Sequence, residues 1–521
     1  MAGALMFSQV PLRKGDSMYV TMALSRCGFL AVAACLCLAS AAAAQEVEDQ
    51  QAEDKLITTL NAKSVINVSE TNRSYRALFD AALELTEAPS TSGGADSAFN
   101  LRTIHPKMSD WAAVSDWAEA NPKLADAILA AKSKAVFGLP YGQGVDQKYL
   151  SNGMYADLSQ EGNLRMQDFA YLDVIDTIAA FATAECYRRF EAGRTQDAID
   201  LVVAQVFLND QICDRLFLLE KLHAIDLQTD FLECARDMMY LYFDQISARQ
   251  YAASEYEGDR KGLSFELPWL RVDLLEMPDG DYESAKAIVE SVFGEDDLAD
   301  PDRFASSFGR VQAEGRPFTQ FGAAARWRLV ANVHRSKLAT LSQLELVYDD
   351  WWRRWGIRAY HRYLDLDPQY ERINPIAYAA VAYSLRDIND IFLARRQLVA
   401  AVNGTALAAA VSGYKKQFGS APDDLEKVYA VHVAKRTDLD PFDREARGFG
   451  YRRVASDRSE DIRVDEFDAF VEVVPSSGLL WARGEDFESG NGRTHSSEGM
   501  SGDIVYWPPL RALARQQGLV E

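Results

Sequence analysis

The chain has 521 residues and a formal net charge of −22 at pH 7, and 48% of its residues are hydrophobic. A chain of this length and hydrophobic content is expected to form about two to four domains with real cores. The acidic balance argues against nucleic acid or an anionic membrane as a partner, because both depend on Lys and Arg to neutralise phosphate charge.

The first 44 residues have the composition of an export signal. A basic Arg26 precedes the apolar run 28–38 and the small residues 39–44, after which the chain becomes acidic. This order is typical of a signal peptide that is cleaved after Ala44. Because the apolar run is too short to span a bilayer comfortably, no transmembrane segment is expected beyond the signal peptide. The sequence therefore predicts an exported protein, periplasmic or extracellular.

Two details of this N-terminal end stay open. Met18 and Met22 lie just ahead of the apolar run, so translation could begin at either of them instead of at the first residue. Residues 32–35 loosely resemble a lipoprotein box that ends at Cys35. Lipidation of Cys35 is the less favoured alternative, because it would leave the apolar residues 36–44 as the mature N-terminus.

After the leader, residues 45–104 form a polar segment and linker with one predicted helix, 73–85. Two short helices are predicted at 111–120 and 122–134. The glycine-rich loop 137–144 lacks the Gly-Lys-Ser/Thr ending of a phosphate-binding loop. We interpret it as a packed turn.

Residues 105–388 are assigned to an α-helical domain. Apolar residues at steps of three and four over 169–190 predict a helix that ends at Gly193. Thr195 then opens a second helix, 196–208, and the short turn predicts an antiparallel hairpin of the tetratricopeptide-like kind. No phrase repeats at a fixed period, so a non-repeating helical domain is favoured over a solenoid.

The pattern beyond this hairpin predicts two further boundaries. Asn209 and Asp210 interrupt the apolar pattern and predict a helix end. Asp230 with Glu233 three residues later predicts the cap of a new helix, since this spacing is typical of a capping box.

Three cysteines remain after the predicted cleavage: Cys186, Cys213 and Cys234. Two interpretations stay open. In an oxidising compartment one pair could bridge adjacent helices, or all three could be small core residues. The spacing contains no Cys-x-x-Cys metal or redox motif.

A cluster of tryptophans, Trp351, Trp352 and Trp355, precedes His361. Aromatic faces stack on sugars and cations, so these side chains are candidate ligand or interface aromatics. Their helical spacing favours a buried or interface stripe over a ligand site. The solvent exposure of the three side chains separates the two interpretations.

Residues 389–521 are assigned to a separate α+β unit because the composition changes there. A long helix over 392–418 is predicted to end at Gly419. Alternating runs then predict a small antiparallel sheet. The predicted strands are 449–454, 469–474 and 478–482. The expected fold is therefore mainly α, with a multi-helix domain followed by a small α+β domain.

Several short sequence segments of this C-terminal region resemble the globular part of type II secretion major pseudopilins. They also resemble the tail of a group of exported bacterial proteins of unknown function. The segments are residues 394–397, 414–425, 439–443, 449–451, 484–486 and 502–506. Residues 127–139 and 193–199 look like the helical portion of the same group. The resemblance implies a pseudopilin-like head fold.

The helix of this head departs from the pseudopilin pattern. In pseudopilins it is highly apolar and stands at the extreme N-terminus, whereas here it is internal and carries Arg395, Arg396, Lys415 and Lys416. Such a helix cannot enter a membrane or pack into a pilus core in the usual way. The resemblance therefore implies the head fold without pilus assembly.

The resemblance also implies a calcium site, because the C-terminal loop of major pseudopilins holds calcium with carboxylates and carbonyls. Hard oxygen ligands in a flexible loop suit this ion. Asp486 and Asp503 stand near the matching positions, with Glu485 and Glu498 as possible helpers. The alternative is an ordinary solvated turn.

No catalytic constellation is evident. The six histidines are scattered, with no His-Glu-x-x-His helix and no Gly-x-Ser-x-Gly elbow. The leading hypothesis is a non-catalytic exported protein, a helical scaffold or interaction module that contacts other envelope or secreted proteins, with a role related to secretion or assembly. The alternative is a periplasmic hydrolase or glycan-binding protein that uses the region from Trp351 to His361.

Overall fold

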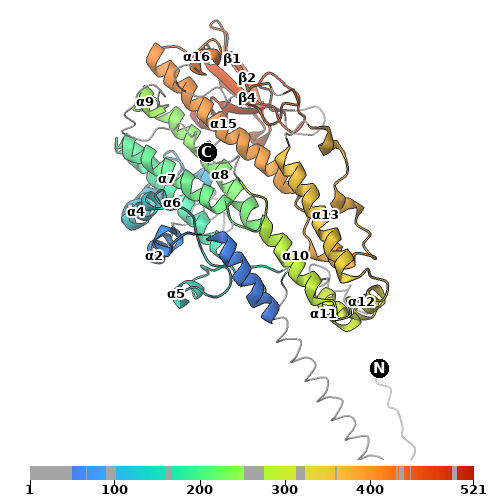
Figure 1. Ribbon diagram of the computed structural model, residues 1–521. Coiled ribbons are helices and arrows are strands. Elements are labelled where there is room, and N and C mark those ends of the chain that lie inside the picture. The colour runs from blue at the N-terminus through green and yellow to red at the C-terminus, as the bar shows by residue number, and fades with distance from the viewer. Residues whose placement is uncertain are drawn as a thin grey trace, which may run out of the picture. The chain divides into compact units, whose positions relative to one another are not determined.

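A computed structural model of the chain consists of two compact units, Met1–Lys55 and Leu56–Glu521 (Figure 1). The structure describes residues 50–65, 67–89, 101–159, 164, 166–251, 275–311, 323–357, 361–429, 432, 439–445, 447–495 and 502–520. In the first unit, residues 50–55 are helical. The predicted signal peptide, with Cys35, lies outside the described residues. The rest of this subsection concerns the second unit.

The second unit is mainly helical, with a small antiparallel sheet near its C-terminus, which confirms the predicted fold class. Its first helices lie close to their predicted positions. They are α2 (Tyr75–Leu83), α3 (Trp111–Ala120), α4 (Pro122–Ala131) and the short α5 (Gln147–Leu150). Proline at the first position of α4 suits a helix start, because its missing N–H would have no partner there.

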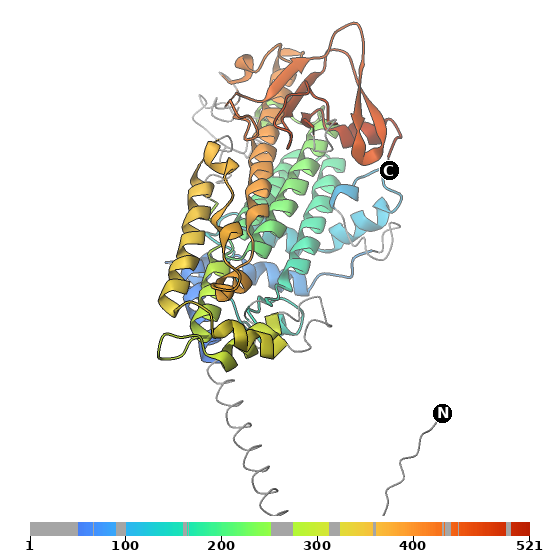
Figure 2. The ribbon, with the colours of Figure 1, turned by 90° about the vertical axis from the view of Figure 1, so that its right-hand side faces the viewer.

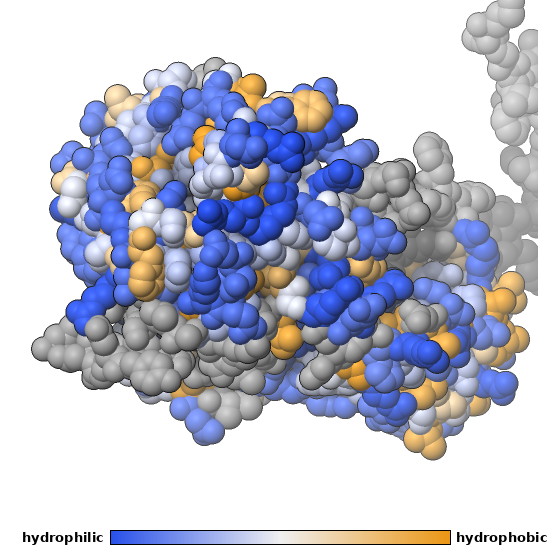
Figure 3. All heavy atoms as spheres, turned by 90° about the horizontal axis from the view of Figure 1, so that it is seen from above, coloured by the Kyte–Doolittle hydropathy of each residue, from blue (hydrophilic) through white to orange (hydrophobic). Residues whose placement is uncertain are grey.

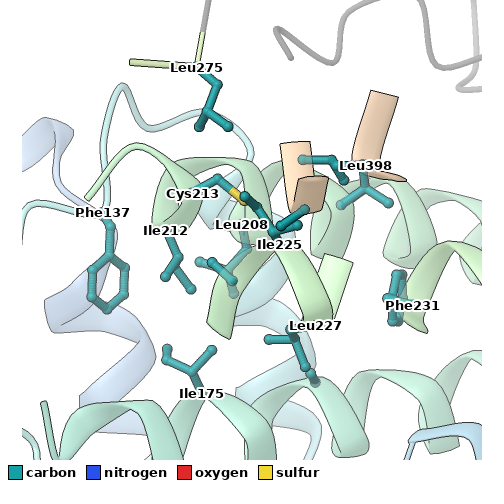
Figure 4. Close-up of a cluster of buried hydrophobic side chains, with 14 of the residues drawn as sticks. Phe137, Ile175, Leu208, Ile212, Cys213, Ile225, Leu227, Phe231, Leu275 and Leu398 are labelled. Atoms are coloured by element: carbon teal, nitrogen blue, oxygen red, sulfur yellow. The ribbon is translucent and has the colours of Figure 1, made fainter. Parts of the chain in front are cut away.

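Three long helices form the centre of the unit: α6 (Tyr171–Glu191), α7 (Thr195–Cys213) and α8 (Leu218–Leu241). The predicted hairpin between α6 and α7 is confirmed, since Gly193 ends α6 with φ +72° and its N–H donates to the Phe190 carbonyl. Their apolar side chains converge with Leu398 from a later helix (Figure 4).

A buried carboxylate reinforces the turn between α6 and α7. Glu185 is 3% exposed and lies 2.6 Å from Arg188, 2.7 Å from Arg189 and 3.7 Å from Arg194. Three cations from the end of α6 and from the turn therefore surround one anion, which explains why this part of the sequence is rich in arginine.

Two predicted helix boundaries are wrong. The helix α7 continues through Asn209, whose buried side chain accepts a hydrogen bond from Gln205 Nε2 at 2.8 Å. This bond lies within α7 itself, four residues apart, and engages the Asn209 carbonyl oxygen, whereas Nδ2 has no hydrogen-bond partner among the described residues. Likewise α8 continues through Asp230, which pairs with Arg102 at 2.6 Å and caps no helix. At Asp230 a tertiary contact outweighs the local signal.

The next group of helices comprises α9 (Ala248–Tyr251), α10 (Asp279–Ser291), α11 (Pro301–Val311), α12 (Ala323–Ala331), α13 (Lys337–Gly356) and α14 (Ala379–Ser384). The pair α11 and α12 pack on each other, and α10 packs against both α13 and α14. Figure 1 shows α10, α11, α12 and α13 toward the other end of the helices from the strands, whereas α9 packs against α15 near the strand end. The view in Figure 2 also places α11 and α12 at the opposite end from the strands.

The long helix α15 (Asn389–Phe418) has α8 on one side and the sheet on another. It is apolar around most of its circumference, as expected for a helix covered on several faces. At Gly404 the Tyr506 ring comes so close that a Cβ would lie 2.4 Å from it. Gly419 ends the helix as predicted, with φ +79°. Within the described ranges, no helix has the length and apolarity to cross a membrane.

The C-terminal strands form a three-stranded antiparallel sheet, in the order β1-β4-β5, and a separate hairpin of β2 and β3. Their bounds are β1 (Gly450–Arg453), β2 (Glu460–Val464), β3 (Ala469–Val473), β4 (Gly478–Ala482) and β5 (Ile504–Trp507). Strands β1, β3 and β4 match the predicted runs, whereas β2 and β5 were not predicted. The short helix α16 (Glu426–Tyr429) precedes the sheet and α17 (Leu510–Gln516) follows it.

Candidate functional site

A buried polar cluster lies at the turn between α7 and α8, and we name it the Glu220 cluster. Glu220 is 0% exposed, and its Oε1 is 2.9 Å from Arg215 Nε. The same oxygen accepts a hydrogen bond from Tyr171 Oη at 2.7 Å, and Oε2 accepts one from Tyr141 Oη at 2.7 Å. One carboxylate thus binds a cation and two phenols in the interior.

The cation of this cluster has contacts with the backbone and with an aromatic ring as well as with Glu220. Arg215 donates through Nη1 to the Leu139 carbonyl at 2.6 Å, and its guanidinium lies 4.0 Å from the centre of the Tyr141 ring. Burial lowers the pKa of Arg215, but the charge and hydrogen bond of Glu220 together with the two tyrosines outweigh burial, so the pKa is raised overall. Burial raises the pKa of the Tyr141 and Tyr171 phenols well above their usual value. Arg215 therefore stays charged, and the phenols stay protonated as donors.

A second carboxylate joins the start of α8 to α10. Asp281 Oδ2 accepts a hydrogen bond from the Leu218 N–H at 2.6 Å and so occupies one of the free donors at the helix start. Arg386 lies 3.9 Å from the other oxygen of this carboxylate. Burial raises the pKa of Asp281 to about 6, although the Leu218 N–H and Arg386 oppose this effect. This carboxylate titrates closer to neutrality than a solvated aspartate.

The other end of α8 carries a second group of ion pairs, which we name the α8–α17 bracket. Its members are Arg102, Asp230, Glu233, Asp237, Glu466, Arg511 and Arg515. Arg511 and Arg515 belong to α17, so the bracket fastens the last helix of the chain to α8. Arg515 Nη1 lies 3.0 Å from Asp237 Oδ2.

Asp237 is an incompletely satisfied member of the bracket. It is 2% exposed, and within the described part of the chain its Oδ1 has no hydrogen-bond partner. Burial raises its pKa to about 7, and the charge of Glu233 adds to this effect, whereas Arg515 and Arg511 oppose it. The bracket therefore contains a buried acid that titrates near neutral pH.

Two acidic residues of the 439–443 segment form a third buried cluster. Asp440 and Asp443 lie 3.0 Å and 3.2 Å from Arg483 Nη1, which comes from the end of β4. Asp440 also accepts the Phe442 and Arg483 N–H groups at 2.9 Å each. This segment, whose sequence resembles that of pseudopilins, thus connects the loop after α16 to the sheet.

The two predicted calcium ligands lie in one loop region. Asp503 is 2% exposed; its Oδ1 accepts the Gly490 N–H at 3.0 Å and its Oδ2 accepts the Gly492 N–H at 2.5 Å. Burial raises the pKa of Asp503, the charge of Asp486 adds to it, and these two N–H groups oppose it. The carboxylate thus closes the loop on itself.

Further ligands for calcium would have to join these two carboxylates. Asp486 Oδ1 accepts the Glu488 N–H at 3.0 Å, and Glu485 accepts a hydrogen bond from Gln397 at 3.4 Å. Glu498 lies outside the described residues. Within those residues no group of three or more His, Cys, Asp or Glu side chains is placed to hold a metal ion. The calcium site at Asp486 and Asp503 stays a prediction.

The three tryptophans have different environments. Trp351 and Trp355 are 0% and 5% exposed, whereas Trp352 is 44% exposed. Trp355 Nε1 donates to the Leu275 carbonyl at 3.0 Å. His361 is exposed. The helical spacing therefore places two of the three rings in the core, and only Trp352 presents a large surface to solvent.

The three cysteines of the helical centre, Cys186, Cys213 and Cys234, are free and buried. Burial raises the pKa of each thiol above its usual value. This arrangement agrees with the interpretation of all three as small core residues.

Comparison of the chain with protein-family models, with curated proteins and with solved structures finds no match.

Sequence reasoning did not find the Glu220 cluster or the α8–α17 bracket. Glu220 stands at the third helical position of α8 and its carboxylate also accepts the Phe217 N–H at 3.3 Å, which is one half of a capping box. Phe217 has no side-chain acceptor for the other half. Arg215 is five residues from Glu220, but the two phenols are distant in sequence. Tyr141 is 79 residues away, so no local pattern could have identified it.

Proposed function

We propose that this chain is a non-catalytic exported protein that acts as a helical scaffold for contacts with other envelope or secreted proteins. The observation that carries the proposal is that the buried charged groups bind other parts of the chain. In the Glu220 cluster the carboxylate is 0% exposed and Arg215 is 3% exposed, and their hydrogen bonds join α6, the turn before α8 and the loop at Leu139. Groups placed in this way brace a framework and are closed to a substrate.

The sequence supports the envelope part of the proposal. The N-terminal leader is typical of export, and the C-terminal segments resemble major pseudopilins, which work in secretion. The bracket adds that α17, at the end of the chain, is fastened to the helical centre through Arg515 and Asp237. A scaffold of this kind would present the helical region and the sheet region as one surface.

The alternative, a hydrolase or glycan-binding protein, receives less support. It needs several exposed aromatic rings near a polar group, because sugars are held between or upon aromatic faces. Of the three tryptophans in that region, only Trp352 is substantially exposed, at 44%.

The export prediction can be tested by fractionating cells that carry the full gene with a C-terminal tag, followed by N-terminal sequencing of the mature chain. A mature chain that begins at Gln45 in the envelope or medium is expected. A chain retained in the cytoplasm with its leader intact would contradict this part of the proposal.

The interaction role can be tested in living cells with a photo-crosslinking amino acid. It would replace Leu346 or Trp352 on α13, and Phe470 on the β2–β3 hairpin would serve as the control, since all three side chains are exposed. A discrete adduct with another envelope or secreted protein, formed from one surface and not from the other, is expected. No adduct at any position, together with turnover of a glycan or peptide by the purified chain, would overturn the proposal.

A further inference from the structure

Exposed apolar side chains are unevenly distributed over the described residues. Of sixteen large hydrophobic residues that are exposed, nine lie between Leu298 and Tyr383. By contrast, the face that Figure 3 shows is mostly hydrophilic, and its apolar residues are scattered in small groups. A concentration of apolar side chains on a soluble surface marks an interaction site.

Five of these residues belong to segments that join at the start of α13, and we name them the α12–α13 patch: Leu298, Leu329, Val333, Leu338 and Ile376. They are 59%, 68%, 61%, 72% and 57% exposed, respectively. Two backbone hydrogen bonds bring their segments together. The Lys337 N–H donates to the Asp297 carbonyl and the Arg335 N–H donates to the Ala377 carbonyl, each at 3.0 Å.

The patch rests on a rigid aromatic base. The Phe304 ring lies 4.6 Å from Phe308 and 5.2 Å from His334, measured between centroids. Trp327 lies 5.3 Å from Phe308 and 5.0 Å from Tyr383. Because packed rings already hold the segments, docking on this patch would cost little ordering entropy.

The charge around the patch differs from that of the whole chain. Residues 294–311 and 323–337 together carry six Lys and Arg against five Asp and Glu, whereas the whole chain has a net charge of −22. Arg335 and Lys337 form no ion pair within the described structure, and neither do the acidic residues 295–297 beside them. Unpaired charges of both signs therefore stand side by side.

We propose that a second copy of this chain docks on the α12–α13 patch in a two-fold symmetric contact. The apolar side chains of one copy pack against those of the other, and Arg335 and Lys337 of each copy face the acidic residues 295–297 of its mate. An isologous contact must be self-complementary, and this patch carries both signs of charge. Two chains of net charge −22 would repel each other through an acidic face. The inference deepens the proposed scaffold role and rests on it.

Sedimentation velocity of the purified full-length chain, over a wide range of concentration, tests the contact. The wild type is expected to dimerise. The double substitution Val333→Asp with Leu338→Asp is expected to weaken dimerisation at least about tenfold, which corresponds to about 1.4 kcal/mol. Phe470→Asp is the matched control, because Phe470 is 62% exposed and Val333 is 61% exposed. The control should leave the dimer intact.

A charge reversal tests the symmetry. Arg335→Glu alone should weaken the dimer, and adding Asp297→Lys should restore it, because each copy then carries both halves of the reversed pair. Circular dichroism would establish that every variant is folded. A monomeric wild type at all concentrations, equal effects of patch and control variants, or no rescue would overturn the inference. A monomer that still forms adducts with other envelope proteins would overturn this inference alone and leave the scaffold role standing.

Discussion

The two ends of α8 use buried charge in different ways. At its start, Glu220 is sealed among Arg215 and two phenols, and each carboxylate oxygen accepts a hydrogen bond from a phenol. Toward its other end, the α8–α17 bracket is partly open, since Arg102 and Asp230 are 31% and 32% exposed, and it contains the incompletely paired Asp237. The Glu220 cluster is sealed from solvent, although Arg215 Nη2 has no hydrogen-bond partner among the described residues, and it acts as a brace. The α8–α17 bracket contains an acid whose pKa is raised to about 7, so it responds to pH. The following substitutions test that difference.

The largest effect is expected for Glu220→Gln, which keeps the size of the side chain and removes its charge. Arg215 would then be buried without its counter-ion, and the free energy of unfolding should fall by about 3–5 kcal/mol. Chemical denaturation would measure it. The control is Asp302→Asn, because the Asp302–Arg328 pair is exposed and such pairs contribute about 0–1 kcal/mol. Similar losses in both variants would contradict the proposed difference.

A substitution at Asp503 measures how much a buried carboxylate that accepts hydrogen bonds from neutral donors contributes to stability. Asp503→Ala would leave the Gly490 and Gly492 N–H groups without acceptors, and a loss of about 1–3 kcal/mol in unfolding free energy is expected. Thermal unfolding with calcium and with a chelator would measure this loss. A stabilisation of the wild type by calcium that the variant lacks would establish the predicted calcium site. An equal loss in both buffers would assign Asp503 to loop closure alone.

Asp237 should make stability depend on pH. Its folded pKa, raised to about 7 by burial, lies above the ordinary value of 3.8, so the folded state keeps a proton that the unfolded state has released. Stability is therefore greatest below the unfolded pKa and declines as pH rises through about 7. Asp281, with a pKa of about 6, contributes the same sign over a lower range.

The window between pH 6 and 7 isolates Asp237 from Asp281. Between pH 6 and pH 7 the free energy of unfolding of the wild type should fall by roughly 1 kcal/mol at most. Asp237→Asn should flatten that slope, whereas Asp281→Asn should leave it largely in place. Urea unfolding at closely spaced pH values would measure both. A slope that is unchanged in Asp237→Asn would place the titrating group elsewhere.

The smallest effect is expected at Trp352. Because this side chain is 44% exposed, Trp352→Ala should change the unfolding free energy by no more than about 0.5 kcal/mol. Trp351→Ala at a fully buried position should cost about 3–5 kcal/mol in the same denaturation assay. A large loss at Trp352 would show that its exposed ring packs more closely than its solvent exposure indicates.

Much of the helical framework could be predicted because its signals are local. Apolar spacing and a glycine at the helix end determine α6 and α15, and both Gly193 and Gly419 adopt the left-handed conformation expected after a helix. Strand β2 was missed because it carries Glu460, Asp461 and Arg463, and β5 because two prolines follow its four residues directly. The tetratricopeptide-like and pseudopilin-like likenesses, the export signal and the domain boundaries stay predictions.

The sequence by itself determined most of the helical segments, that a small antiparallel sheet follows the long helix, and that the chain is strongly acidic. Only the tertiary structure decided that α8 continues through Asp230, because Arg102, 128 positions away, pairs with this residue. It also decided the charged clusters: the Arg515–Asp237 pair joins residues 278 positions apart. Such contacts depend on how the helices pack against one another, and the spacing of residues within a short segment does not predict this packing.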